Sequence, residues 1–157
     1  MDKVTQDRIA LLHPKVREEV TTIINKWNKE LTGRAQVRIA QGLRTNKEQD
    51  AFYAQGRTTA GAKVTNAKAG QSIHNYGLAV DIVLIIDGKT ASWDTKADWD
   101  GDKKADWMEC VEIFKKHGWD WGGDWKSFKD LPHFEKRGYS WRELYNKPKD
   151  SSGYVKI

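Results

Sequence analysis

The segment SIHNYGLAVDI, residues 72–82, places a histidine and an aspartate close together in a mostly apolar part of the chain. Asp81 stands inside the run LAVDIVLII, which is otherwise apolar on both faces and predicts a central strand. An ionised carboxylate in such a strand costs several kcal/mol of folding free energy unless it is paired or binds a metal. His74 lies upstream across a turn that Gly77 permits, so its imidazole can return to the carboxylate. The pair would give zinc a nitrogen and an oxygen ligand; a salt bridge from Asp81 to a basic side chain is the structural alternative.

A catalytic zinc site uses three protein ligands and a water molecule, and three further histidines are candidates for the third ligand. His13 precedes a proline that begins a helix, and we expect it at the surface. His117 follows two lysines in the last turn of another helix, where it favours the helix dipole. His133 follows a proline that fixes the backbone and begins a strand-like HFE. Spacing therefore favours a metal site made of His74, Asp81 and His133.

A second group of acidic residues lies in the segment DWDGDKKADWME. Positions 1, 3, 5, 9 and 12 of a calcium-loop pattern are occupied by Asp98, Asp100, Asp102, Asp106 and Glu109. Lys103 stands where that loop prefers glycine, so we expect weaker calcium binding than in a complete loop. Calcium would order the helix that follows and could thereby tune activity, while a solvated acidic loop is the alternative.

The first half of the chain supplies a helix, a strand and a second helix. A helix after Pro14 is predicted by apolar residues at helical spacing, namely Val16, Val20, Ile23, Ile24, Trp27 and Leu31. Alternation over 35–43 predicts a strand. Thr45 and Glu48 then form a capping box for a helix that ends near Gly56. Residues 58–71 are small and polar, and their composition is compatible with an ordered loop or a linker.

The second half adds strands around the apolar run 78–86, which ends in a turn at 87–89. One face of the following helix, which stops near Gly118, carries Trp107, Cys110, Val111 and Phe114. WDWGG and HFEK predict short strands, and SWRELYN predicts a terminal helix capped by Ser140. Because there is no regular βαβ alternation, we predict an α+β fold with a small, mainly antiparallel sheet flanked by helices and a zinc site on the sheet.

Composition indicates one soluble globular domain over residues 1–157, with 38% hydrophobic and 31% charged residues. The single cysteine, Cys110, excludes an intrachain disulfide and a thiolate metal cluster. The net charge of +5 favours an anionic partner such as nucleic acid, a membrane or a cell wall, but the basic residues are spread along the chain, which weakens the nucleic-acid hypothesis. The N-terminus lacks the features of a secretory signal, so we expect synthesis in the host or bacterial cytoplasm.

Two segments, GRTTAGAKVTNAKAGQSIHNYGLAVDI and WGGDWKSFKDLPHFE, resemble the L-alanyl-D-glutamate endopeptidases of phage lysis enzymes and their bacterial cell-wall relatives. These proteins group with D-Ala-D-Ala carboxypeptidases in one zinc-peptidase superfamily. Its pattern is Ser-x-His-x-x-Gly-x-Ala-x-Asp, followed by an acid shortly before Pro-His. The matching residues are Ser72, His74, Gly77, Ala79, Asp81, Asp130, Pro132 and His133. The resemblance extends from about Leu11 to Glu135.

The resemblance implies roles for residues that spacing alone leaves open. It implies Asp130 as the general base, although Glu135 also qualifies locally because residues 133 and 135 of a strand share a face. It implies that Arg44 binds the carbonyl oxygen or a substrate carboxylate, whereas a surface salt bridge is the alternative. Ser72 would hydrogen-bond substrate or shape the turn.

The resulting hypothesis is a zinc-dependent endopeptidase that cuts the L-Ala-D-Glu bond of peptidoglycan stem peptides, as a phage lysis enzyme does. The alternatives are a D,D-carboxypeptidase on the same site and a non-catalytic module that binds cell wall or nucleic acid. We expect a monomer without nucleic acid, stable membrane insertion or a separate wall-binding module, which acts on the wall after release from the cytoplasm.

Overall fold

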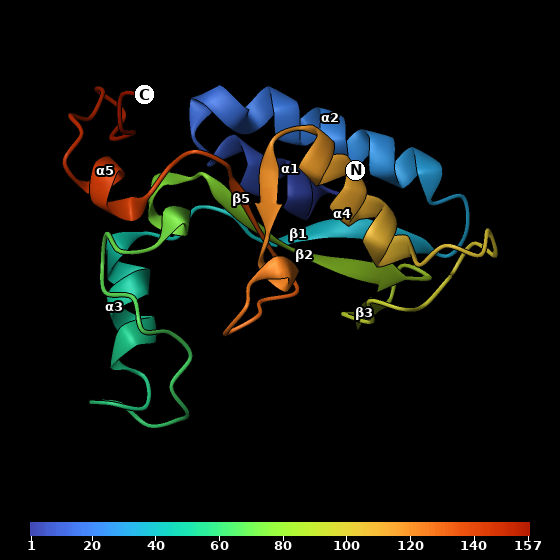
Figure 1. The fold of residues 1–157 in the computed structure, drawn as a ribbon, viewed down its shortest axis with the longest axis horizontal. Helices are drawn as coiled ribbons and strands as arrows, with labels where there is room; N and C mark the ends of the chain where they lie inside the picture. The colour runs from blue at the N-terminus through green and yellow to red at the C-terminus, as the bar shows by residue number, and fades with distance from the viewer.

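The computed structural model describes all 157 residues and has an α+β fold, as predicted (Figure 1). Its five-stranded sheet is antiparallel throughout, in the order β1-β2-β5-β4, with β3 paired to β2. The strands are β1 (Ala35–Gln41), β2 (Ala79–Ile86), β3 (Thr90–Ser92), β4 (Trp119–Trp121) and β5 (His133–Lys136).

Three helices pack against one side of this sheet, and the two others lie near one end of the molecule (Figure 1). The packed helices are α1 (Lys3–Ala10), α2 (Pro14–Glu30) and α4 (Asp106–Lys116). The remaining elements are α3 (Asn46–Ala54), α5 (Trp141–Tyr145) and the 3₁₀ turns η1 (Ile73–Tyr76) and η2 (Gly122–Asp124). None of the helices combines the length and the apolar character needed to cross a membrane.

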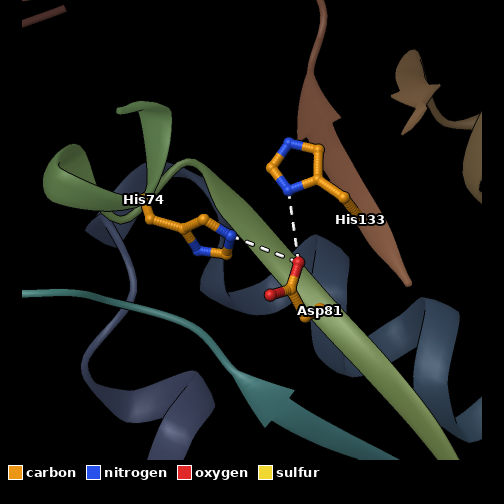
Figure 2. A group of neighbouring side chains, drawn as sticks. All are labelled: His74, Asp81 and His133. Atoms are coloured by element: carbon orange, nitrogen blue, oxygen red, sulfur yellow. Dashed lines mark hydrogen bonds and ion pairs between the residues drawn. The ribbon is translucent and has the colours of Figure 1, made fainter. Parts of the chain in front are cut away.

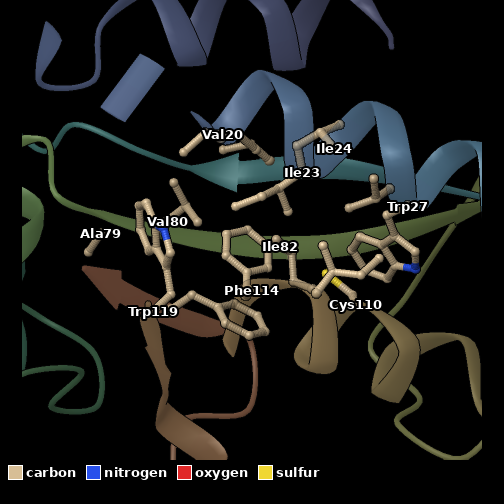
Figure 3. Close-up of a cluster of buried hydrophobic side chains, with 14 of the residues drawn as sticks. Val20, Ile23, Ile24, Trp27, Ala79, Val80, Ile82, Cys110, Phe114 and Trp119 are labelled. Carbon is tan, nitrogen blue, oxygen red and sulfur yellow. The ribbon is translucent and has the colours of Figure 1, made fainter. Parts of the chain in front are cut away.

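Strand β2 is the central strand that its apolar sequence predicts, because it pairs with β1 on one side and with β5 on the other. Val80 and Ile82 point into the hydrophobic core between the sheet and helices α2 and α4 (Figure 3). Successive side chains of a strand point to opposite faces, so Asp81 lies on the face away from that core. The helices therefore stabilise one face of β2 and leave the other available for polar chemistry.

Aromatic side chains link β5 to the core beneath α4. The ring of Phe114 stacks on that of Phe134, with 4.3 Å between centroids, and meets Trp119 edge to face at 5.5 Å. Trp27 and Trp107 are also fully buried, so core packing accounts for them as the helical spacing predicted. Because Phe134 follows His133 directly, this packing also fixes the start of β5.

The structure differs from the sequence-based expectation at several places. Neither α1 nor β3 was anticipated. His13 is buried: its Nδ1 accepts a hydrogen bond from the backbone N–H of Lys15, and its Nε2 lies 2.7 Å from the carbonyl oxygen of Val155. Residues 58–71 form an irregular loop held to α3, since Gln49 Nε2 donates to the carbonyl of Ala67 at 2.7 Å.

We predict that Phe114→Ala lowers the free energy of unfolding by about 3–5 kcal/mol, because it removes a buried ring that stacks on Phe134. Denaturant unfolding followed by circular dichroism would measure the loss. Met108→Ala is the matched control, since Met108 is exposed on the same helix and its replacement should change stability by less than about 0.5 kcal/mol. Equal effects of the two substitutions would contradict the packing described here.

Candidate functional site

Pairing of three strands places the first polar residues of the site side by side. In the sheet register, Asp81 of β2 lies opposite His133 of β5 and opposite Gln41 of β1. A register shift between Ile39 and Gln41 brings Gln41 opposite Asp81. Directly opposed residues of antiparallel strands point to the same face, so all three side chains belong to the face away from the helical core.

The turn at η1 brings His74 to the same place. Ser72 Oγ accepts a hydrogen bond from the backbone N–H of His74 at 3.3 Å, and Asn75 Oδ1 accepts one from the backbone N–H of Ser72 at 3.1 Å. Gly77 ends the turn at a φ of 70°, where a Cβ atom would lie only 2.5 Å from the backbone nitrogen of His13. Only glycine fits there. In this structure Ser72 shapes the turn.

His74, Asp81 and His133 meet as the sequence predicted (Figure 2). Asp81 Oδ1 lies 3.2 Å from His74 Nε2 and 3.2 Å from His133 Nδ1. Both histidines are buried, with 3% and 5% of their surfaces exposed, while 22% of the Asp81 side chain remains accessible. The group is therefore enclosed by protein and open at the carboxylate.

The outer nitrogen of each imidazole contacts an oxygen that can only accept a hydrogen bond. His74 Nδ1 lies 2.8 Å from the carbonyl oxygen of Gly42, and His133 Nε2 lies 2.8 Å from Glu135 Oε1. Those nitrogens therefore carry the proton, and in neutral rings the nitrogens facing Asp81 carry lone pairs. Three acceptors that face one another require a cation between them. Two imidazole nitrogens, a carboxylate oxygen and these outer hydrogen bonds suit zinc.

Charge in this cluster is strongly coupled. Burial raises the pKa of Asp81, but hydrogen bonds from His133 and His74 outweigh it and hold that pKa well below its usual range. Burial also disfavours the charged form of His133 and so lowers its pKa. Its hydrogen bonds to Asp81 and Glu135 outweigh this effect and raise that pKa to about 9. The group thus favours positive charge next to Asp81, supplied either by a proton or by a metal ion.

The two candidate bases have different environments. Glu135 shares a face with His133, as expected, but its carboxylate is engaged by the imidazole. Asp130 lies on the loop before β5, where its carbonyl accepts a hydrogen bond from the N–H of His133 at 3.2 Å. Burial, followed by the charge of Asp81, raises the pKa of Asp130. Glu135 therefore orients the imidazole of His133, whereas Asp130 forms no side-chain ion pair.

Arg44 follows β1 and forms no ion pair with a carboxylate, so the salt-bridge alternative is wrong for this residue. Its terminal nitrogens donate to Gln49 Oε1 at 3.0 Å and to Gln41 Oε1 at 2.5 Å. The guanidinium lies over the ring of Phe52, and its Nε is buried without a partner. Burial lowers the pKa of Arg44, and the charge of Asp81 opposes that shift. The cation is therefore held next to the site by neutral groups and remains available to an anion.

Sequence reasoning missed the residues that build the loop before β5. The backbone N–H of Asp130 donates to the carbonyl of Gly122, and a Cβ atom at Gly122 would lie 2.3 Å from the carbonyl oxygen of Asp130. Trp121 Nε1 donates to the carbonyl of Leu131 at 2.7 Å, and the ring of Trp125 lies 5.2 Å from that of His133. The WGG triplet is the sequence signal that could have indicated this close packing.

The acidic residues of segment 98–109 lie apart from this site, at the start of α4. The structure brings their carboxylates together in two overlapping groups, Asp98 with Asp100 and Asp106, and Asp100 with Asp102 and Glu109.

Comparison with known proteins finds similarity over most of the chain. Residues 65–136, which contain His74, Asp81, His133 and Asp130, match the family model described as D-alanyl-D-alanine carboxypeptidase. CwlK of Bacillus subtilis (strain 168), a peptidoglycan L-alanyl-D-glutamate endopeptidase by name, is 46% identical over 125 residues, or 79% of this chain and 72% of that protein. An L-alanyl-D-glutamate peptidase of Listeria phage A118 is 34% identical over 106 residues, or 66% of this chain and 32% of the phage protein.

A solved structure shares the same fold. The crystal structure of the Serratia marcescens L-Ala D-Glu endopeptidase ChiX matches with a TM-score of 0.59 over 91% of each chain, at 18% sequence identity. At this identity the likeness concerns the fold alone, and it agrees with the α+β prediction.

We predict that Gly122→Ala destabilises the protein by about 1–3 kcal/mol, because the added methyl group would overlap the carbonyl oxygen of Asp130. Amide chemical shifts over residues 121–134 should change, and denaturant unfolding would measure the loss. Lys126→Ala, an exposed substitution in the same loop, is the control and should leave both unchanged. Wild-type stability and wild-type amide shifts in Gly122→Ala would show that the contact is unimportant.

Proposed function

The chain belongs to the peptidase family described as D-alanyl-D-alanine carboxypeptidase, and we propose that it is a zinc-dependent endopeptidase that hydrolyses the L-Ala-D-Glu bond of peptidoglycan stem peptides. The observation that carries the choice of bond is its similarity to CwlK, over most of both chains. A role in lysis of a bacterial host belongs to the same proposal and is supported by the similarity to the phage peptidase. The net charge of +5 suits an anionic cell wall.

His74, Asp81 and His133 would hold the zinc ion. Their donor atoms lie within 4.8 Å of one another, and the outer hydrogen bonds to Gly42 and Glu135 orient both imidazoles for metal binding. When bound, zinc would lower the pKa of a water molecule toward 7 and polarise the scissile carbonyl group.

Asp130 would act as the general base and then as the general acid. It is held next to His133 by backbone hydrogen bonds, and its carboxylate is free of ion pairs. It accepts a proton from the attacking water molecule as the C–O bond forms. It then returns that proton to the leaving amine as the C–N bond breaks.

Arg44 would stabilise negative charge on the substrate. Its guanidinium is positioned by Gln41 and Gln49, and its charge is balanced by no carboxylate in direct contact. A preorganised cation is effective where charge develops in the transition state, and it also suits the free carboxylate of the D-glutamate residue. Arg44 therefore binds the carbonyl oxygen or that carboxylate.

We expect purified cell walls treated with the zinc-loaded protein to release new N-terminal D-glutamate, which amino-terminal labelling and mass spectrometry would identify. Removal of zinc by a chelator should abolish the release, and added zinc should restore it. His133→Ala should lose bound zinc and activity together, because it removes one of three ligands. Release of free D-alanine in place of N-terminal D-glutamate would favour a D,D-carboxypeptidase.

The two acids should separate in kinetic and metal-binding measurements. Asp130→Asn should retain zinc but lower kcat by about 10²–10⁴-fold, since it removes general-base assistance. Glu135→Gln should weaken zinc affinity by about 10–100-fold while kcat at saturating zinc stays near the wild-type value, because Glu135 orients His133. Competition with a chromophoric chelator measures the affinity. The reverse ranking of the two variants would make Glu135 the base.

A further inference from the structure

The acidic segment 98–109 packs against the end of the sheet that is remote from the metal site. A Cβ atom added to Gly33, just before β1, would lie 2.8 Å from the carbonyl oxygen of Trp99 and 3.0 Å from the Cα of Asp100. Gln41, which neighbours Asp81, is the last residue of the same strand. The segment is therefore tightly packed into the fold, and its chemistry is separate from that of the proposed zinc site.

The carboxylates of this segment converge without a counterion from the protein. Within each of the two overlapping groups, one oxygen per residue lies within 4.8 Å of the others, and Asp100 belongs to both. None of the five acids forms an ion pair with a lysine, arginine or histidine. Lys103 and Lys104 of the same loop are exposed. The negative charges therefore repel one another when no cation is present.

Asp106 supplies an independent indication of a ligand. The residue is 0% exposed, and while its Oδ1 accepts a hydrogen bond from the backbone N–H of Trp99 at 3.3 Å, its Oδ2 is buried without any partner. Glu109 Oε2 is likewise buried and unpartnered. A buried carboxylate oxygen without a donor is unfavourable and rare in folded proteins.

We propose that segment 98–109 binds one calcium ion. The donor set consists of oxygen atoms only, which suits a hard cation and differs from the nitrogen-containing set of the zinc site. Calcium accepts many protein oxygens in flexible geometry, whereas magnesium usually keeps several waters and is bound through one or two carboxylates. The carboxylate ligands are Asp98, Asp100, Asp102, Asp106 and Glu109.

The loop adopts its turn although Lys103 replaces the glycine that a calcium loop prefers at this position. Lys103 has a φ of 70°, so it adopts the left-handed conformation that a calcium loop requires at this position. Asp98 stabilises this shape, because its Oδ2 accepts a hydrogen bond from the N–H of Lys103 at 2.8 Å and its Oδ1 accepts one from Gly101 at 2.9 Å. The lysine therefore makes the turn less favourable than glycine would, but it does not prevent it.

Calcium bound here would stabilise the fold. Asp106 and Glu109 lie in the first turn of α4, and the carbonyl of Asp106 accepts a hydrogen bond from the buried Trp27 Nε1 of α2 at 3.1 Å. Trp107, the next residue of α4, is fully buried in the hydrophobic core. An ion that joins the loop to this turn would fix the start of α4 against α2.

The test is calorimetric titration of calcium into protein that was stripped of metal and reloaded with one zinc ion per chain, followed by thermal unfolding with and without calcium. We expect one calcium ion per chain and a rise in Tm of several degrees at saturating calcium. Asp100→Asn and Glu109→Gln should each weaken calcium binding by at least about 10-fold, by analogy with the loss of other metal-site partners. Glu112→Gln, which removes an exposed acid from the same helix, is the matched control and should bind calcium as the wild type does.

Asp100→Asn should also raise the Tm of calcium-free protein, since it removes charge from a repelling group. Weaker calcium binding together with a higher Tm of the calcium-free protein indicates a lost ligand, whereas a misfolded variant would have a lower Tm. The proposal is overturned if calcium at millimolar concentration gives neither heat nor a Tm shift, or if Asp100→Asn binds calcium with wild-type affinity. An equal response to magnesium at the same concentration would also overturn the calcium assignment. Because these measurements involve no peptidoglycan, their outcome is independent of the proposed hydrolytic activity.

Discussion

The arrangement of the proposed zinc site depends on one cross-strand pair, Asp81 with His133, at the centre of the sheet. A shift of β5 by one residue would move the imidazole to the helical face and bring Phe134 out of the core. The stacking of Phe134 on Phe114 opposes such a shift. Packing on the apolar face of the sheet therefore fixes the position of the side chains of the proposed zinc site on the opposite face. His74 then completes the group from a turn whose shape is set by local hydrogen bonds.

The two clusters of acidic and imidazole groups lie at different ends of the same sheet and differ in donor chemistry. The group around Asp81 combines nitrogen and oxygen donors, and its histidines are oriented by a carbonyl and by Glu135. The group around Asp106 contains only oxygen donors, with two buried oxygens that no protein donor reaches. The first set suits a Lewis acid for catalysis, and the second suits a cation that stabilises structure. Spatial separation allows each to be tested without disturbing the other.

Much of the local structure was determined by the sequence alone. The apolar spacing after Pro14 predicted α2, and the capping box at Thr45 predicted α3, where both reciprocal hydrogen bonds are present. The apolar run around Asp81 predicted the central strand, and Gly77 predicted the turn that returns His74 to it. These features were predictable because each is encoded by residues within one or two turns or within one strand. The resemblance to known peptidases added the proposed general base, Asp130, and the proposed anion-binding residue, Arg44.

Only the tertiary structure decided the contacts between distant segments. His133 reaches Asp81 across 52 positions of sequence, and His13 is buried because it meets Val155, which is 142 positions away. The engagement of Glu135 by His133, and the packing of Gly122 under Asp130, likewise follow from how β4, β5 and the loop between them close on one another. Local periodicity carries no information about such pairs. They are selected by the burial of the apolar face and by the strand register, which together offset the entropy of closing the intervening loops.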